Sequence, residues 1–334
     1  MIASGNIHPR ALLLMLIAFM PLVILLSLQT GEVSVVLADL WQTESVAHQV
    51  FMGLRFPRLC LTLLAGALLG ITGAAVQAMF RNPLADPSLI GVSAGAGLAA
   101  VAMLVFGGAF IAYMGDFALP LAAFLGGLLA TWLVSRIARR VDAVSVTTML
   151  LVGIAINATA ASGISALKYF SDDFSLRQVV FWLMGGLQHQ GWSEVVVLAL
   201  IALPVFLGLL SQSRTLNLLL LGERQAQLLG VSVQRCHRYL IVFCALGVGA
   251  VVAVGGMIGF VGLVVPHLVR LMIGPDNRYL LPLSALLGAL FLTLADVLAR
   301  LLIAPAELPL GVVTSLLGGP FFLLMILYRR GGMQ

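Results

Sequence analysis

Charged residues are scarce in this sequence. Asp, Glu, Lys and Arg make up 9% of its 334 residues, whereas 61% are hydrophobic and the mean hydropathy is +1.11. A soluble domain usually carries about 25% charged residues, so that class is excluded. The apolar runs are continuous, as in membrane helices of about 20 residues, and do not alternate as in a membrane β-barrel. The sequence therefore predicts an all-α, polytopic membrane protein.

Lysine is almost absent, with Lys168 as its single occurrence. A Walker A loop needs a Gly-Lys-Ser/Thr sequence, so this chain cannot bind ATP in the P-loop manner. The zinc-hydrolase pattern H-E-x-x-H is also missing, and we expect no metal site. Any transport against a gradient must draw its energy from a partner chain or from an ion gradient.

Cysteine occurs three times, at Cys60, Cys236 and Cys244, without C-x-x-C spacing. We interpret all three as packing residues. The net charge of +5 does not indicate a nucleic-acid partner, because the basic residues form short clusters between apolar runs. Such clusters are typical of topology signals at a lipid surface.

The apolar runs predict about ten membrane-spanning helices in a single domain, residues 1–334. Their expected ranges are 11–29, 58–80, 88–108, 117–137, 146–168, 193–211, 238–257, 258–273, 279–300 and 308–328. The eighth contains Pro266 and is expected to be about half a helix. Ten crossings place both termini on one side. Thirteen basic residues lie on that side, which predicts that the termini are cytoplasmic. The five basic residues on the other side are Arg55, Arg58, Lys168, Arg177 and Arg300.

Two segments of the chain resemble each other. Residues 119–131 read LPLAAFLGGLLAT and residues 281–293 read LPLSALLGALFLT, with eight of thirteen positions identical. In the predicted topology they cross the membrane in opposite directions, which indicates an inverted repeat of two five-helix halves. The alternative is chance similarity between two helices rich in Leu, Gly and Ala.

The stretch FRNPLADPSLIGVSAGAG, residues 80–97, interrupts the apolar sequence. Its GVSAG segment matches the G-x-S-x-G elbow of hydrolases, which requires a strand before the serine. Here Ser93 follows Pro87 and opens an apolar helix. We therefore interpret the glycines as small residues that let helices approach closely, and the enzyme hypothesis is disfavoured.

Residues 212–238 form the longest connection on the side of the termini. Gly222 can start a short helix there, Glu223 suits its first turn, and Gly230 can end it. Leu228 and Leu229 would lie on one side of this helix, with Arg224 and Gln227 elsewhere. The segment is either a docking helix for a soluble partner or a solvated connector.

On the opposite side, residues 169–192 predict a short helix over 176–184 that Ser175 caps and that ends at two glycines. It is either a lid over a pathway or an interfacial helix that fills space. Arg55, Arg58 and Arg300 also lie on this side, against the topology rule. They indicate either a docking site for an acidic protein or snorkelling near lipid headgroups.

An ion-driven carrier usually places several ionisable residues in mid-membrane. This chain offers Asp296, with His267 near the end of the eighth span. We interpret Asp296 as a structural acid that is either capped by neighbouring polar groups or matched to Arg300, one turn further on. It supports proton coupling only weakly.

Four motifs in order resemble the permease subunits of the FecCD/BtuC family of ABC importers. They are LRFPR (54–58), QAMFRNPLADPSLIGVSAGAG (77–97), LGERQAQLLGVSVQR (221–235) and GFVGLVVPHLVR (259–270). This family imports iron chelates, haem and cobalamin, and the chain most resembles haem-importer permeases of Gram-negative bacteria. The resemblance implies a multi-pass protein of the bacterial inner membrane that is itself no enzyme and binds no cofactor.

The resemblance also implies partners: a second copy of this chain, two cytoplasmic ATPases that bind ATP and Mg²⁺, and a periplasmic binding protein. By the resemblance, residues 212–238 contact the ATPase, and Arg55, Arg58 and Arg300 dock the binding protein. Residues 169–192 are predicted to be a periplasmic gate segment. The implied cytoplasmic gate holds Asn82, Pro83 and Leu84. The implied ATPase contacts are Glu223, Arg224, Gln227, Leu228, Leu229 and Gly230.

The substrate is predicted to be haem, with a ferric siderophore or cobalamin as the alternative cargo of the same machine. A stand-alone, ion-driven carrier is the less favoured class. Haem iron accepts histidine as an axial ligand, which makes His189 and His267 candidates for transient contact with the cargo. We favour a structural role for His267, because it belongs to a motif that permeases for other chelates also contain.

Overall fold

The computed structural model describes residues 7–31, 45–141, 146–188 and 190–331. In these ranges the chain forms helices and turns without strands. Ten helices correspond to the ten predicted spans, and their ends differ from the predicted ones by at most five residues. They are α1 (Pro9–Gln29), α3 (Phe56–Met79), α4 (Val92–Phe106), α6 (Ala118–Val141), α7 (Val146–Tyr169), α9 (Trp192–Ser211), α12 (Val233–Gly255), α13 (Val261–Ile273), α14 (Asn277–Leu301) and α15 (Leu310–Gly331).

Seven helices among the described residues are long and apolar enough to span a membrane, and three further apolar helices are shorter. The short ones are α4, α13 and the first part of α15. Helix α13 has 13 residues and contains Pro266, which confirms the partial helix expected there. The chain is thus an all-α protein with about ten membrane helices.

Shorter helical segments join these spans. They are α2 (Val46–Val50), η2 (Phe51–Arg55), η3 (Pro87–Ile90), α5 (Gly108–Met114), η4 (Gly115–Phe117), α8 (Asp173–Met184), α10 (Ser213–Leu220) and α11 (Glu223–Leu228). Segments α2, η2 and α3 run on without a break as one helical stretch of 34 residues. Pro57 is tolerated because it lies in the first turn of α3, and the π-helical turn η2 precedes it.

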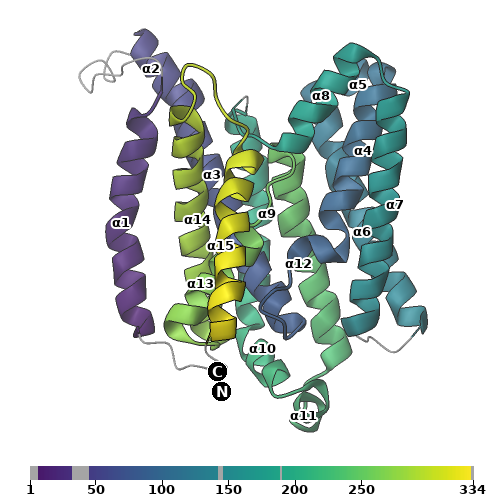
Figure 1. The fold of residues 1–334 in the computed structure, drawn as a ribbon, viewed down its shortest axis with the longest axis vertical. Coiled ribbons are helices and arrows are strands. Elements are labelled where there is room, and N and C mark those ends of the chain that lie inside the picture. The colour runs from purple at the N-terminus through teal and green to yellow at the C-terminus, as the bar shows by residue number, and fades with distance from the viewer. Residues whose placement is uncertain (1–6, 32–44, 142–145, 189, 332–334) are drawn as a thin grey trace.

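Helix α3 lies at the centre of one half of the bundle and packs against α14, α13, α12, α9 and α1 (Figure 1). Glycines make the closest approaches possible. A Cβ atom at Gly66 or Gly70 would overlap the backbone carbonyl of Gly288 or Ser284 on α14. In the other half, α4 packs against α6 and α7, and Gly95 lies directly against the backbone of Gly126.

The end of the bundle where α1 begins and α15 ends is at the bottom of Figure 1, and we call it the lower face. Helix α11 projects from the lower face, and α8 lies at the opposite, upper face. Helices α6 and α14 contain the two similar segments and run in opposite directions between these faces. That is the geometry an inverted repeat requires, and the repeat itself stays a prediction.

One predicted helix start was wrong. Helix α8 begins at Asp173 with Asp172 as its N-cap residue, so Ser175 lies inside the helix and does not cap it. Asp and Ser both suit an N-cap position, and the pattern alone did not distinguish them. Hydrogen bonds from Ser175 and from backbone N–H groups hold the pKa of Asp172 below its usual value.

Candidate functional site: two polar clusters at opposite faces

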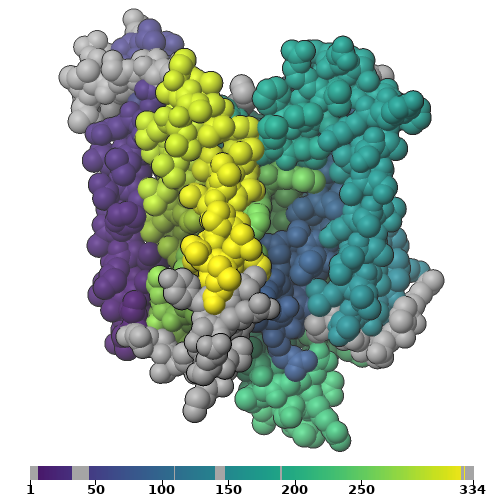
Figure 2. Space-filling view, viewed as in Figure 1, coloured from purple at the N-terminus to yellow at the C-terminus, as the bar shows by residue number. Residues whose placement is uncertain are grey.

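Helices α10 and α11 form a lobe that projects from the lower face, and α11 is its tip (Figures 1 and 2). Gly222 precedes the helix at φ +113°, and Gly230 follows it at φ +86°. The N–H groups of Gly230 and Val231 donate to the carbonyls of Gln227 and Ala226, which completes a Schellman motif. The helix therefore begins and ends where the glycines predicted.

The surface of α11 joins apolar and charged groups. Ala226 is buried against the rest of the lobe, whereas Leu228 is 82% exposed and Leu229 is 60% exposed. Arg224 and Gln227 are also exposed. Two adjacent exposed leucines on a short, well-terminated helix form a compact apolar knob. This geometry suits insertion into a groove of a soluble partner.

The turn between α3 and α4 lies beside α11. Arg81 has a left-handed backbone at φ 48°, and its guanidinium lies 3.9 Å from the Glu223 carboxylate. The Asn82 side chain accepts a hydrogen bond from the Leu84 N–H at 3.0 Å, and Asp86 accepts one from the Ser88 N–H at 2.8 Å. The turn thus has a defined shape and is linked by an ion pair to the projecting lobe.

Pro83 and Leu84 line a narrow crevice together with His267 of α13. Leu263, Val264, Phe321 and Phe322 complete its walls. The structure therefore brings two of the three predicted gate residues together with one of the two candidate histidines. His267 is 9% exposed. His189 lies outside the described residues.

The segment around Ser93 is helical. The 3₁₀-helix η3 and Gly91, at φ +84°, lead directly into α4, with no strand before the serine. The close contact of Gly95 with α6 agrees with the predicted role of the glycines in packing. Among the described residues, no group of three or more His, Cys, Asp or Glu side chains lies close enough to hold a metal ion.

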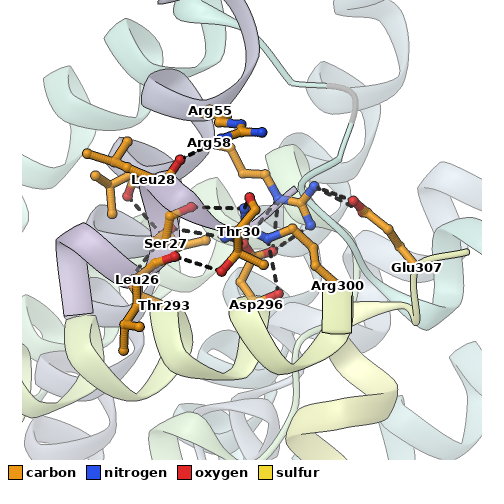
Figure 3. A network of polar contacts seen from close by, with 12 residues as sticks. Leu26, Ser27, Leu28, Thr30, Arg55, Arg58, Thr293, Asp296, Arg300 and Glu307 are labelled. Carbon is orange, nitrogen blue, oxygen red and sulfur yellow. Dashed lines mark hydrogen bonds and ion pairs between the residues drawn. The ribbon is translucent and has the colours of Figure 1, made fainter. Parts of the chain in front are cut away.

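A second cluster of charged residues lies near the upper face, between α1, α3 and α14 (Figure 3). Arg58 donates from Nε and Nη2 to the Asp296 carboxylate at 2.8–3.1 Å. Its Nη1 donates to Glu307 at 3.0 Å, in the connection between α14 and α15. Asp296 is 1% exposed, so this is a buried, bidentate ion pair.

Arg300 also pairs with the Asp296 carboxylate, through its second oxygen. Its Nη2 lies 2.9 Å from the carboxylate, which confirms the pairing of these two residues one turn apart. The same guanidinium donates to the carbonyls of Ser27 and Thr30 and to the Ser27 hydroxyl, at the end of α1. Arg300 therefore fastens α1 to α14 where an apolar sequence offers few other polar contacts.

Arg55 also bonds to the end of α1. Its Nη1 donates to the Leu28 carbonyl at 2.8 Å, and the residue is 6% exposed. All three predicted docking arginines thus lie in one cluster, and within it they contact acidic and carbonyl groups of this chain. The cluster holds three guanidinium groups and two carboxylates.

The Arg58–Asp296 pair and the contact of Arg58 with Glu307 were not predicted from the sequence. Arg58 and Asp296 are 238 positions apart, so no helical spacing relates them. A general signal was present, because a lone acid and a lone arginine in two apolar spans each need a partner. That signal does not say which arginine meets which acid.

The model of the FecCD transport family matches residues 16–328. The chain belongs to this family. Members of this family include permease proteins of transport and import systems. The chain is therefore a transporter permease subunit and not an enzyme.

Two relatives of this FecCD permease align over nearly all of their length. The Hemin transport system permease protein HmuU of Yersinia pestis is 42% identical over 330 residues, which are 98% of each chain. The Vitamin B12 import system permease protein BtuC of Vibrio cholerae is 44% identical over 304 residues, 91% of this chain and 90% of that one. The two carry different cargoes by name.

A solved structure shares the fold of the FecCD permease described here. It is an inward-facing conformation of a metal-chelate type ABC transporter, and it superposes with a TM-score of 0.86 at 32% identity. The match covers 96% of this chain and 100% of the other. The fold is therefore that of an ABC transporter permease over the matched 96% of the chain.

Proposed function

We propose that this FecCD-family permease carries haem into the cytoplasm as the membrane-spanning part of an ABC importer. The observation that carries the proposal is the 42% identity to a hemin transport permease over 98% of both chains. The alternative cargo is cobalamin, because vitamin B12 permeases align at 44% over 91% of this chain. A ferric siderophore is the third candidate, from the same family of chelates.

The machine we propose contains two copies of this chain, two ATPases and a periplasmic delivery protein. The lower face is the cytoplasmic one, since thirteen of the eighteen basic residues lie on that side in the predicted topology. ATP and Mg²⁺ bind to the partner ATPases, because this chain has no P-loop. Haem is the cargo and not a resident cofactor.

The α11 knob is the proposed ATPase contact. Leu228 and Leu229 enter a groove of the ATPase, with Glu223, Arg224 and Gln227 around them and Gly230 setting the end of the helix. The exposure of both leucines supports this role, because a solvated connector gains nothing from an apolar tip. The Arg81–Glu223 ion pair then links this contact to the gate turn at Asn82, Pro83 and Leu84.

Replacing Leu228 and Leu229 together by Asp is expected to lower co-purification of the ATPase at least about tenfold, as loss of an interface hot spot does. The measurement is the ATPase-to-permease ratio after affinity purification of the permease. Leu302→Asp is the matched control, because Leu302 is 59% exposed at the opposite face. Equal ATPase-to-permease ratios in both variants would show that α11 does not contact the ATPase.

At the upper face, we propose that carboxylates of the delivery protein dock at Arg55, Arg58 and Arg300. The cluster carries one net positive charge, three guanidinium groups against two carboxylates. Docking there requires the delivery protein to compete with Glu307, which is 33% exposed, for the outer edge of Arg58. Asp296 is buried and pairs with Arg58 and Arg300.

The test is uptake into proteoliposomes that contain the permease, its ATPase and its delivery protein. We expect ATP-dependent uptake of haem and little uptake of cobalamin or a ferric siderophore. Uptake of cobalamin instead would keep the importer and overturn the haem assignment. ATP-independent uptake driven by a proton gradient would overturn the ABC mechanism itself. His267→Ala in the same assay measures whether this crevice residue contributes to haem passage.

A further inference from the structure

A polar contact joins the lobe of the lower face to helix α14. The side chain of Asn217, on α10, donates from Nδ2 to the Asp276 carboxylate at 2.6 Å. Its Oδ1 accepts from the backbone N–H and from Nδ2 of Asn277 at 2.8 and 2.9 Å. Both donor and acceptor ends of one amide are therefore used on the first turn of α14. We call this group of three residues the Asn217 clasp.

The clasp completes the N-terminal cap of α14. Asp276 is the N-cap residue, and its side chain accepts from the Arg278 N–H. The N–H of Asn277 is one of the first-turn donors that a helix leaves without an internal partner, and Asn217 supplies its acceptor from another helix. Asn277 is fully buried. Burial acts to raise the pKa of Asp276, but hydrogen bonds from Asn217 and Arg278 outweigh it and lower the pKa.

The clasp lies close to the proposed ATPase contact. Helix α10 ends at Leu220, and α11 begins at Glu223, with a single tight turn between them. Leu216 and Leu219 are buried, and α10 packs on both α3 and α14. A displacement of α11 therefore acts on α10, and Asn217 hydrogen-bonds α10 to the first turn of α14.

Helix α14 reaches from the clasp to the charged cluster of the upper face. Its 25 residues span about 37 Å at 1.5 Å per residue. Along this length the backbone lies against α3 at Gly66 and Gly70, and near its other end it carries Asp296 and Arg300. Pro282 lies inside α14, but the helix runs on past it, and its close packing on α3 carries a displacement of the first turn toward the charged cluster.

We infer that Asn217 is a positioning residue that couples the ATPase contact on α11 to the charged cluster through α14. The inference rests on the proposed docking of α11 onto an ATPase. Asn217 touches neither cargo nor ATP in this scheme. Its function is to make α14 follow the lobe when the ATPases move it.

The test exchanges the donor and acceptor of the clasp. Asn217→Asp keeps the acceptor for Asn277 but replaces the Nδ2 donor with a carboxylate oxygen beside the Asp276 carboxylate, which repels it. The double variant Asn217→Asp with Asp276→Asn restores a complementary pair with the donor on the other side. Asn is also a good N-cap residue. Arg278→Gln is the control, because it removes an exposed ion pair with Asp276 and leaves the clasp intact.

The readout is haem taken up per ATP hydrolysed in the reconstituted complex, together with ATPase co-purification and the melting temperature of the permease. For Asn217→Asp we expect normal co-purification and a fall in uptake per ATP of about tenfold, in the usual range of coupling between sites. The double variant is expected to recover, and Arg278→Gln is expected to match the wild type.

The outcomes separate this inference from the proposed function. A wild-type permease that retains no ATPase overturns the role of α11 and the coupling with it. A wild-type complex that assembles, combined with full uptake per ATP in Asn217→Asp, overturns the coupling alone. The coupling is also overturned if the double variant does not recover uptake per ATP at an unchanged melting temperature. The restored hydrogen-bonded pair would then have no effect on transport.

Discussion

Asp296→Ala is expected to lower the free energy of unfolding by about 3–5 kcal/mol, as removal of one member of a buried ion pair does. Asp296 is 1% exposed and holds two guanidinium groups, those of Arg58 and Arg300. Without it, the three guanidinium groups of the cluster stay together with Glu307 as its remaining carboxylate. The measurement is chemical unfolding in detergent micelles, followed by tryptophan fluorescence and circular dichroism.

Glu307→Gln is the control for this prediction. Glu307 also pairs with Arg58, but its side chain is 33% exposed, and exposed ion pairs contribute about 0–1 kcal/mol. The two variants remove the same kind of charge from the same arginine at different depths. A loss in Asp296→Ala as small as that in Glu307→Gln would show that water reaches the cluster and that Asp296 does not organise it.

Gly70→Ala is expected to destabilise the permease by about 3 kcal/mol, at the upper end of the usual cost of overpacking. The new methyl group would overlap the Ser284 carbonyl on α14, and this atom belongs to the backbone and cannot rotate away. Helix α14 must then move off α3. We expect a lower melting temperature and, because α14 also carries the clasp and Asp296, reduced uptake.

Gly53→Ala makes the same chemical change where there is space. Gly53 lies in the helical stretch before α3, and a Cβ there meets no atom within 4 Å. Alanine favours a helix over glycine by about 1 kcal/mol, so this variant is expected to be neutral or slightly stabilising. If both variants lowered the melting temperature equally, the effect at Gly70 would come from the helix backbone and not from the contact with α14.

The short helix α11 shows what local sequence can predict about the site. Its start at Glu223 and its end before Gly230 follow from two glycines with positive φ, a property of single residues. The exposure of Leu228 also agrees with the sequence pattern. A six-residue helix on a loop can bury one side, and in α11 the buried side holds Ala226. By contrast, the start of α8 was predicted too late, because Asp172 and Ser175 both satisfy the local rule for a cap.

The charged cluster shows what local sequence cannot predict. The pairing of Asp296 with Arg300 was expected because both lie on one helix, four residues apart. The pairing of Asp296 with Arg58 depends on how α3 and α14 pack, and that in turn depends on Gly66, Gly70 and Gly288 meeting at the same depth. The Asn217 clasp was missed for the same reason, since α10 and α14 meet only in the folded chain.

By itself, the sequence determined the class of this protein and its membrane helices, and it excluded a P-loop of its own. These conclusions rest on hydropathy, on proline and glycine positions and on the absence of a P-loop lysine. Such features are read from short segments and do not depend on how the helices pack. Only the tertiary structure decided which charges meet across different helices. In a membrane every buried charge requires a partner, but helix packing chooses that partner from residues more than two hundred positions apart.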